Sequence, residues 1–337
     1  MTLFVRRTVR TRISRYLVAL VAPLALVAAA TTGCASSVHN HSGSSGADVT
    51  VDVPSAGPVT ISGIPTRIVT LNSQWTDVLL NFGITPVGYY DVIQLKSGAP
   101  APWFNPNIKQ STFLDPSKDL VGNVAKLNPD LIVGNAQSEG GPTTNGEALG
   151  KLAPFVPKVS SQQVDPWQTM VTVMGRILHQ EQKAREIIDG VQNKITQIGT
   201  DYPQLKGKSF AFAAVYGADQ ITTLGDQNDG AAQFFTDLGM RVAPGLAAEA
   251  TRANTARPQL SAENINLLNS DLLVINAATP ALQTSFTALP GYQNLTAVQS
   301  GAVSWLDLIA IFGLNSPSPS SITAILESMR PAFAKVR

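Results

Sequence analysis

The segment Leu127-Asn-Pro-Asp-Leu-Ile-Val-Gly-Asn-Ala136 decides the fold, because the chain repeats it as Leu268-Asn-Ser-Asp-Leu-Leu-Val-Ile-Asn-Ala277. In each copy a short helical pattern leads into Asn-x-Asp and then into a run of branched apolar residues. This order is typical of a helix that feeds a buried strand of a parallel sheet. The copies lie about 140 residues apart, roughly one domain length. We therefore predict two Rossmann-like α/β lobes, each with a mainly parallel sheet, and a ligand site between them.

The N-terminus has the order of an export signal. Five arginines lie between residues 6 and 15, an apolar stretch covers 17–30, and small residues lead to Cys34. We predict a signal peptide over 1–33 and, because 34–58 are rich in Ser, Gly and Ala, a flexible tether there. Thr31-Thr-Gly-Cys34 resembles a bacterial lipoprotein signal, which implies lipidation of Cys34 and anchoring to the extracytoplasmic face of the cytoplasmic membrane. An ordinary signal peptide with an incidental cysteine is the alternative.

The charge balance of the remaining chain excludes some partners. Removing residues 1–34 takes away five arginines and leaves 19 basic against 23 acidic side chains, a formal net charge of −4. No basic stripe is present, so nucleic acid is not an expected partner. Cys34 is the only cysteine, which excludes a disulfide within the chain.

The rest of the chain divides into three parts. The pattern predicts a first α/β lobe over 59–164 and a second over 202–337. Between them, Asp165 can cap a helix whose apolar residues recur at spacings of three and four as far as Ile198. We predict a single long linking helix over 165–201, about 50 Å long at 1.5 Å per residue. Two helices broken near Gly190 are the alternative.

Four short motifs carry a family resemblance. They are Thr66-Arg-Ile-Val69, Phe82-Gly-Ile-Thr-Pro-Val-Gly88, Leu127-Asn-Pro-Asp-Leu-Ile132 and Leu260-Ser-Ala-Glu-Asn264. Their order over residues 59–337 resembles the substrate-binding proteins of iron-siderophore and cobalamin ABC importers. The resemblance implies a class III periplasmic-binding-protein fold, a monomer without enzymatic activity, capture of a ligand between the lobes, and delivery to a membrane permease.

The residues themselves indicate what kind of ligand to expect. No Ser-His-Asp set, Gly-x-Gly-x-x-Gly turn or P-loop is evident, and His179 is the only histidine beyond the tether. We therefore predict no catalytic residues, no protein-bound metal and no cofactor. A metal inside an organic chelator needs only aromatic walls, hydrogen bonds and a few charges, which favours a ferric siderophore. Haem, with Tyr89, Tyr90 or Tyr216 as axial ligand, and cobalamin stay open.

Candidate ligand contacts are the aromatic and polar residues that follow predicted strands, since open α/β sheets bind ligands there. Arginines are added because guanidinium groups suit the anionic oxygens of chelators. The predicted contacts are Trp75, Tyr89, Tyr90, Trp103, Asn135, Tyr216, Arg252, Arg257, Asn276 and Trp305.

The resemblance also implies one docking glutamate for the permease on each lobe. Glu263 matches the position on the second lobe, whereas the repeat places Gly122 at the equivalent position of the first. Asp119 or Glu139 would have to replace the missing carboxylate. The substitution also motivates an alternative, a cell-envelope interaction protein whose cleft is degraded.

Overall fold

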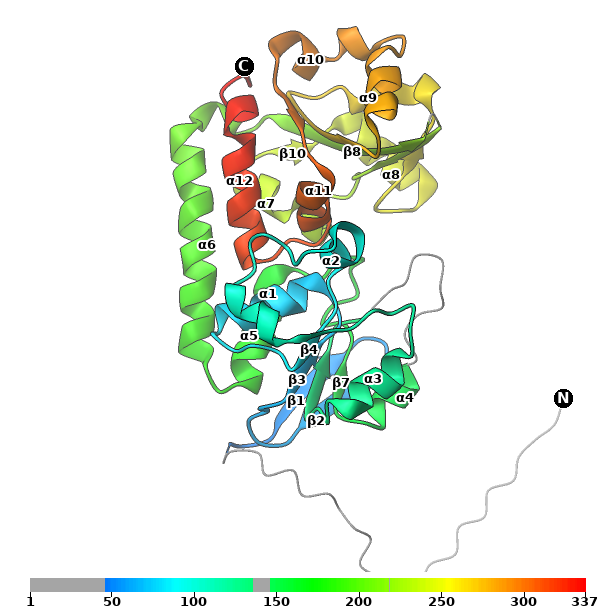
Figure 1. Ribbon diagram of the computed structural model, residues 1–337. Helices are drawn as coiled ribbons and strands as arrows, with labels where there is room; N and C mark the ends of the chain where they lie inside the picture. Colours follow the sequence, from blue (N-terminus) through cyan, green and yellow to red (C-terminus); the bar gives the residue numbers. More distant parts are fainter. Residues whose placement is uncertain (1–45, 136–145, 218) are drawn as a thin grey trace, which may run out of the picture. The chain divides into compact units, whose positions relative to one another are not determined.

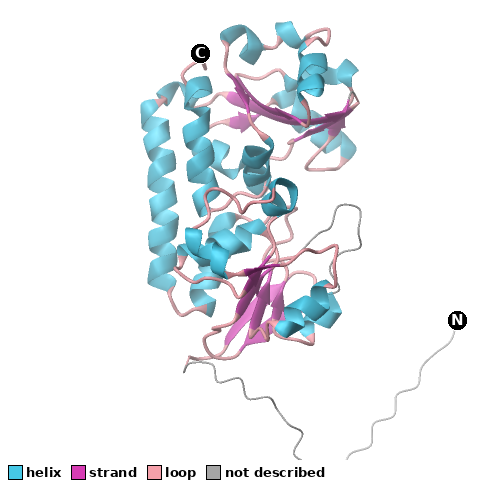
Figure 2. Ribbon diagram, viewed as in Figure 1, coloured by secondary structure: helices cyan, strands magenta, loops and turns pink. Residues whose placement is uncertain are grey.

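The computed structural model describes residues 46–135, 146–217 and 219–337, which all belong to one compact unit of the chain, residues 41–337. The described residues form two sheets of mainly parallel strands covered by helices, and a separate two-stranded hairpin (Figure 1, Figure 2). This confirms the predicted α/β class with two sheets. The signal peptide and Cys34 lie outside the described residues.

The first lobe contains a fully parallel sheet in the order β5-β4-β3-β6-β7. Its strands are β3 (Ile68–Thr70), β4 (Gly88–Tyr89), β5 (Thr112–Phe113), β6 (Leu131–Val133) and β7 (Phe155–Val156). Its helices are α1 (Ser73–Asn81), α2 (Val92–Ser97), α3 (Leu120–Lys126) and α4 (Gly146–Gly150), with a 3-10 turn at Pro106–Gln110. The chain builds outward from β3 to one side and then returns to the other. The carboxyl ends of β3 and β6 therefore meet at a switch point, the usual ligand position in such sheets.

The second lobe contains a six-stranded sheet in the order β11-β9-β8-β12-β13, with β10 also paired to β8. The strands are β8 (Ser209–Gly217), β9 (Gln220–Thr223), β10 (Arg241–Val242), β11 (Gln259–Leu260), β12 (Leu272–Ala277) and β13 (Val303–Trp305). The helices are α7 (Gln233–Asp237), α8 (Pro244–Ala253), α9 (Pro280–Thr287), α10 (Thr296–Ser300), α11 (Leu308–Asn315) and α12 (Pro319–Phe333). Strands β8, β10, β12 and β13 run parallel and β9 runs antiparallel, so the switch point lies between β8 and β12.

The aspartate of the repeated segment has the same role in both lobes. Asp130 precedes β6, and its carboxylate accepts the backbone N–H of Thr66 at 2.7 Å and of Arg67 at 2.8 Å, just before β3. Asp271 precedes β12 and accepts the backbone N–H of Ser209 at 2.7 Å, at the start of β8. In each lobe the carboxylate satisfies donors at the start of the neighbouring strand and so fixes the pairing of the two central strands.

Part of the predicted tether is folded, so the prediction of a flexible segment as far as residue 58 is wrong. Strands β1 (Val49–Val53) and β2 (Gly57–Ile61) form an antiparallel hairpin with Val51 opposite Val59. Val51 and Val53 are buried in the main core. Val-Thr-Val-Asp-Val alternates apolar and polar residues, which is the pattern of a half-buried strand.

The linking segment is two helices rather than the predicted single helix over 165–201. Helix α5 (Trp167–Ile177) and helix α6 (Glu181–Asp201) are separated at residues 178–180, where His179 has a left-handed φ of 53°. The alternative break near Gly190 is also wrong, because Gly190 lies inside α6. A Cβ atom on Gly175 would lie 2.5 Å from the Cβ of Ala184, so this glycine allows the two helices to turn tightly against each other.

The two lobes meet at contacts between α1 and the start of α12, which we call the interlobe seam. The Nε2 of Gln74 donates to the carbonyl oxygens of Pro317 at 2.7 Å and Asp165 at 3.3 Å. The Oδ2 of Asp77 accepts the backbone N–H of Ser320 at 2.8 Å, in the first turn of α12. One apolar core cluster includes residues of both sheets together with α5, α6 and α12. The lobes therefore share a core and do not fold around separate ones.

Candidate functional site

Residues at or shortly after the carboxyl ends of the parallel strands, here called strand-end residues, form a polar framework in the first lobe. After β3, Asn72 caps α1 by accepting the backbone N–H of Trp75 at 2.8 Å. The hydroxyl of Ser73 donates to Oδ1 of Asp91 at 2.7 Å. Asp91 follows β4, caps α2, and also accepts the backbone N–H of Ala101 at 2.9 Å. These bonds fix α1 and α2 with their N-termini at the same edge of the sheet.

Burial raises the pKa of two titratable groups of this framework. Burial raises the pKa of Asp91, although the hydrogen bonds from Ser73 and from backbone amides oppose the shift. Burial and the neighbouring Asp91 raise the pKa of Tyr89 to about 12, and its hydroxyl donates to Gln94. The phenolate that would coordinate haem iron is therefore disfavoured at Tyr89 at neutral pH.

In the second lobe, Tyr216, Asn276 and Trp305 lie at the carboxyl ends of three neighbouring strands, β8, β12 and β13. The Nδ2 of Asn276 donates to the carbonyl oxygen of Leu306 at 2.8 Å, which ties the end of β12 to the end of β13. The Oδ1 of Asn276 is buried without a partner. Trp305 packs edge-on against Phe286, with ring centroids 6.5 Å apart. The structure therefore brings these three predicted residues to one edge of the sheet.

Strand ends are also where large apolar side chains reach solvent. Among the described residues, the exposed large hydrophobic side chains are Leu95 (36%), Tyr216 (47%) and Leu308 (40%). Leu95 lies on α2 after β4, Tyr216 ends β8, and Leu308 begins α11 after β13. Helices α2 and α11 are in contact. Exposed apolar groups gathered at strand ends of both lobes are typical of a ligand site. Sequence reasoning identified Tyr216 but missed the two leucines, which look like ordinary helix residues.

Several predicted contacts have packing roles instead. Trp75 is fully buried in the main core, and Tyr89 and Tyr90 are buried in smaller apolar clusters. Asn135, after β6, is partly exposed and interacts with other residues. Trp103 lies beside Gly313 of α11 and lines a groove of about 420 Å³ with α6 and α12. It therefore does not lie among the strand-end residues.

The two predicted arginines are both ion-paired within the protein. Leu260 of β11 pairs with Ile221, which pairs with Val215 near the end of β8. Arg257 precedes β11, and the carbonyl oxygen of the next residue, Pro258, accepts the N–H of Thr223, which pairs with Ala213 at the level of Trp305. Its guanidinium donates to both carboxylate oxygens of the buried Asp229, at 3.1 and 3.0 Å, and to Asn315 at 2.8 Å.

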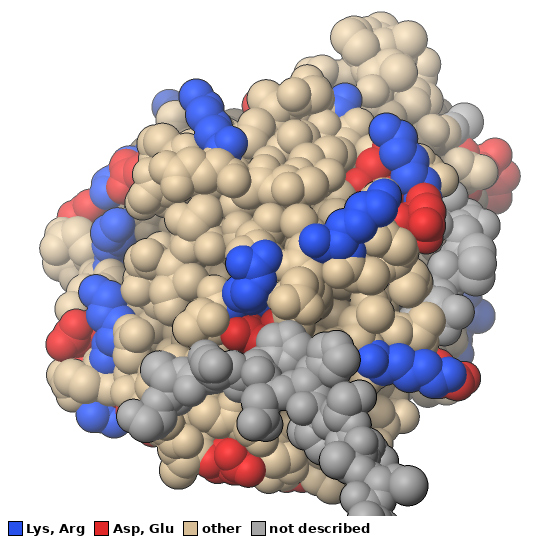
Figure 3. Space-filling view, turned by 60° about the horizontal axis from the view of Figure 1, so that its bottom comes forward, with Lys and Arg blue, Asp and Glu red and all other residues tan. Residues whose placement is uncertain are grey.

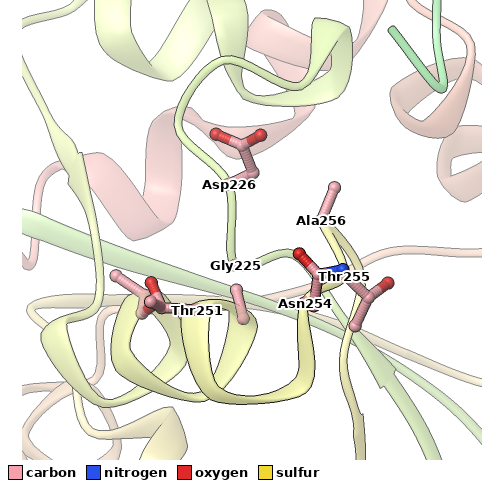
Figure 4. Close-up of a pocket in the computed structure, with 8 residues that line it drawn as sticks. Gly225, Asp226, Thr251, Asn254, Thr255 and Ala256 are labelled. Carbon is pink, nitrogen blue, oxygen red and sulfur yellow. The ribbon is translucent and has the colours of Figure 1, made fainter. Parts of the chain in front are cut away.

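Arg252, at the end of α8, is exposed and forms an ion pair with Glu249. A pocket of about 350 Å³ lies beside it, between the loop after β9 and the C-terminal end of α8 (Figure 4). Its polar lining includes Asp226, Thr251, Asn254 and Thr255. The carboxylate of Asp226 is the only charged group of that lining, which does not suit an anion.

The described residues contain no group of three or more His, Cys, Asp or Glu side chains that could hold a metal ion. Within the same residues, no helix is both long and apolar enough to cross a bilayer.

Comparison with known proteins agrees with this architecture. Residues 68–308 match the family described as periplasmic binding protein. The chain belongs to this family. Its members are extracytoplasmic binding proteins rather than enzymes, which confirms the predicted class and the absence of an enzymatic role.

Curated relatives of this periplasmic binding protein occur in Bacillus subtilis. It is 24% identical to the Fe(3+)-citrate-binding protein YfmC over 295 residues, 86% of this chain and 89% of that protein. It is 26% identical to the probable siderophore-binding lipoprotein YfiY over 143 residues, 40% and 39% of the two chains.

Solved structures show the same fold. Streptococcus pneumoniae PiaA in complex with ferrichrome aligns with a TM-score of 0.70 at 20% identity, covering 86% of this chain and all of that one. Staphylococcus aureus SirA complexed with staphyloferrin B aligns with a TM-score of 0.70 at 21% identity, covering 85% and 98%. These likenesses confirm the class III architecture of the binding protein.

Proposed function

We propose that this periplasmic binding protein captures a ferric siderophore or a similar iron chelate between its lobes and delivers it to an ABC permease. The observation that carries the proposal is the exposure of Leu95, Tyr216 and Leu308 at strand ends of both lobes. Exposing such groups to water is unfavourable unless a ligand covers them in part of the working cycle. The names of YfmC and YfiY, which refer to ferric citrate and to siderophores, support an iron chelate.

A chelate fits this site better than a bare ion because the chelator already supplies the metal's ligands. The protein then contributes apolar contacts and hydrogen bonds. Tyr216 and Trp305 lie at the ends of the strands on either side of Asn276, whose Oδ1 is buried without a partner. Capture in this way leaves the coordination sphere of the iron unchanged.

Ligand titration tests the proposal. Protein fluorescence and thermal shift would be measured with ferric trihydroxamate, ferric tricatecholate, ferric citrate, free ferric ion, haem and cobalamin. We expect ferric chelates to bind and to raise the unfolding temperature. Tyr216→Ala and Leu308→Ala should each weaken binding by about 5- to 30-fold, which corresponds to 1–2 kcal/mol of lost apolar contact.

Thr196→Ala, on the exposed face of α6, is the matched control and should bind like the wild type. Binding of haem or cobalamin alone would support the alternative ligands of the same fold. Absence of binding by every compound would refute capture of these ligands and favour an interaction protein of the cell envelope.

For delivery, we propose that one exposed carboxylate on each lobe docks onto the permease. Glu263 is exposed in the 3-10 helix Ala262–Leu268. On the first lobe, Asp119 caps α3 and accepts the N–H of Gly122 at 2.9 Å, and its carboxylate occupies the place that a Gly122 side chain would need. Asp119 therefore supplies a carboxylate where the repeat has lost one. Asp119→Lys and Glu263→Lys should each reduce iron uptake in cells without changing chelate affinity.

Lipid anchoring through Cys34 remains part of the proposal. The name of YfiY, a lipoprotein, supports it. Cys34→Ala should release the protein from the membrane fraction of cells, whereas Ala35→Ser should not.

A further inference from the structure

Resting on the proposed function, we infer that the preferred ligand is an uncharged ferric chelate of the trihydroxamate type, and not a polycarboxylate or catecholate complex. Three hydroxamates balance the charge of Fe³⁺, whereas three catecholates leave three negative charges and citrate complexes are also anionic. The inference depends on which charges the described strand-end residues offer to a ligand.

The arginines expected to bind anionic oxygens are already paired. Both oxygens of Asp229, which has no exposed surface, accept from Arg257, whose side chain is only 14% exposed. Removing Arg257 from this pair would leave a buried carboxylate without its counter-ion, which is strongly unfavourable. Arg257 is therefore held in place and is not available to follow a ligand. Arg252 is paired with Glu249.

Of the lysines nearest in sequence to strand ends of the first lobe, Lys118 has a carboxylate partner, and Lys158, held by carbonyl oxygens, keeps its charge. Lys118 lies 3.9 Å from Asp115, and Lys158 donates to the carbonyl oxygens of Gln162 and Gln163. Lys96, on α2, takes part in a further interaction. Glu139, the other candidate docking carboxylate of the first lobe, lies outside the described residues.

The second lobe places negative charge beside the exposed apolar groups. Asp219 follows Tyr216 closely, and Asp307 directly precedes Leu308 and caps α11 by accepting the N–H of Ala310 at 2.7 Å. Both aspartates are exposed. An anionic chelate would have to approach these carboxylates while losing water, which costs free energy that a neutral complex does not lose.

Figure 3 shows the face that lies at the bottom of Figure 1, at the outer end of the first lobe, where blue and red side chains are scattered among uncharged ones. No broad basic area is visible on that face. At the strand ends, shape and apolar contact are then the main sources of affinity.

The test measures dissociation constants for ferrichrome, ferric citrate and a ferric tricatecholate by fluorescence quenching at low and high salt. We expect ferrichrome to bind at least about tenfold more tightly than either anionic complex, a difference of about 1.4 kcal/mol. The affinity for ferrichrome should change by less than about twofold between roughly 50 and 500 mM salt, because salt screening affects charged ligands most.

A charge-reversal variant makes the test specific. Asp219→Lys should increase the affinity for ferric citrate by about threefold or more and leave ferrichrome binding unchanged. Asp52→Lys, on the exposed side of the hairpin, is the control and should change neither. Tighter binding of an anionic chelate by the wild type, or no gain from Asp219→Lys, would overturn the inference alone. Failure of all chelates to bind would overturn the proposed function and the inference with it.

Discussion

The buried carboxylate of Asp77 at the interlobe seam makes the stability of the protein depend on pH. Asp77 is 1% exposed, and its oxygens accept from the backbone N–H of Ser320 at 2.8 Å and from Nδ2 of Asn81 at 3.2 Å. Burial raises the pKa of Asp77 from 3.8 to about 6, against the opposing effect of hydrogen bonds from Ser320, Ser318 and Asn81. No charged side chain contributes to this shift.

The direction and size of this pH dependence follow from the linkage between protonation of Asp77 and folding. Below pH 3.8 the group is protonated in both states, so the folded protein has its full stability. As the pH rises to about 6, the unfolded chain loses the proton first, and the free energy of unfolding decreases. The total loss is about 3 kcal/mol, from 1.36 kcal/mol per pKa unit, and about 2 kcal/mol of it falls between roughly pH 4.5 and 8.

Urea unfolding of the wild type and of Asp77→Asn at pH 4.5 and 8 tests this reasoning. An amide cannot ionise, so the decrease in unfolding free energy between the two pH values should be smaller in the variant by about 2 kcal/mol. The substitution also alters hydrogen bonds at the seam, but this loss of stability is the same at both pH values and cancels when the two decreases are compared. Asp52→Asn, on the exposed hairpin, should behave like the wild type. Equal decreases in the wild type and Asp77→Asn would refute the argument.

Other predictions concern packing. Gly313→Ala should destabilise the protein by about 1–3 kcal/mol, because the new Cβ would lie 2.5 Å from Trp103. Gly190→Ala should stabilise α6 by about 0.5–1 kcal/mol, because open space surrounds this helix position. Chemical unfolding measures both changes. Gly134→Ala should lower the free energy of unfolding by about 1–3 kcal/mol, because Gly134 has a φ of 86° and the Trp75 ring lies close to the position of the new Cβ. An unchanged unfolding midpoint would contradict this prediction. Gln74→Leu should lower the free energy of unfolding by about 1–3 kcal/mol, because two carbonyl oxygens of the interlobe seam lose their donor. Slower hydrogen exchange of the α12 amides in this variant would contradict the prediction.

The sequence was sufficient to predict the two mainly parallel sheets, because their central strands carry a repeated local signal. Asp130 and Asp271 each precede a run of branched apolar residues, and both the helix before and the strand after follow from local pattern. The strand-end positions of Tyr216, Asn276 and Trp305 followed in turn, since a strand's carboxyl end is known once the strand is placed.

Features that depend on distant partners were not predictable in this way. Asp77 looks like an ordinary helix residue, because its partner Ser320 is 243 positions away. Arg257 looks like an available cation, because nothing in the local pattern shows that Asp229 accepts from it. The break after α5 was missed although residues 179–186 contain no apolar residue larger than Ala184. The tight turn itself depends on the close approach of Gly175 and Ala184, which local spacing does not show.

The shared core has a consequence for how the molecule denatures. Helices α5, α6 and α12 bury apolar side chains against both sheets at once. If one lobe unfolds, part of the apolar core of the other lobe is therefore exposed to water. Expressing the two lobes as separate fragments would expose the apolar surfaces that they share. Such fragments should aggregate and should not fold as independent domains. The protein should melt as one cooperative body, and movements during ligand exchange are then confined to the outer loops and small tilts.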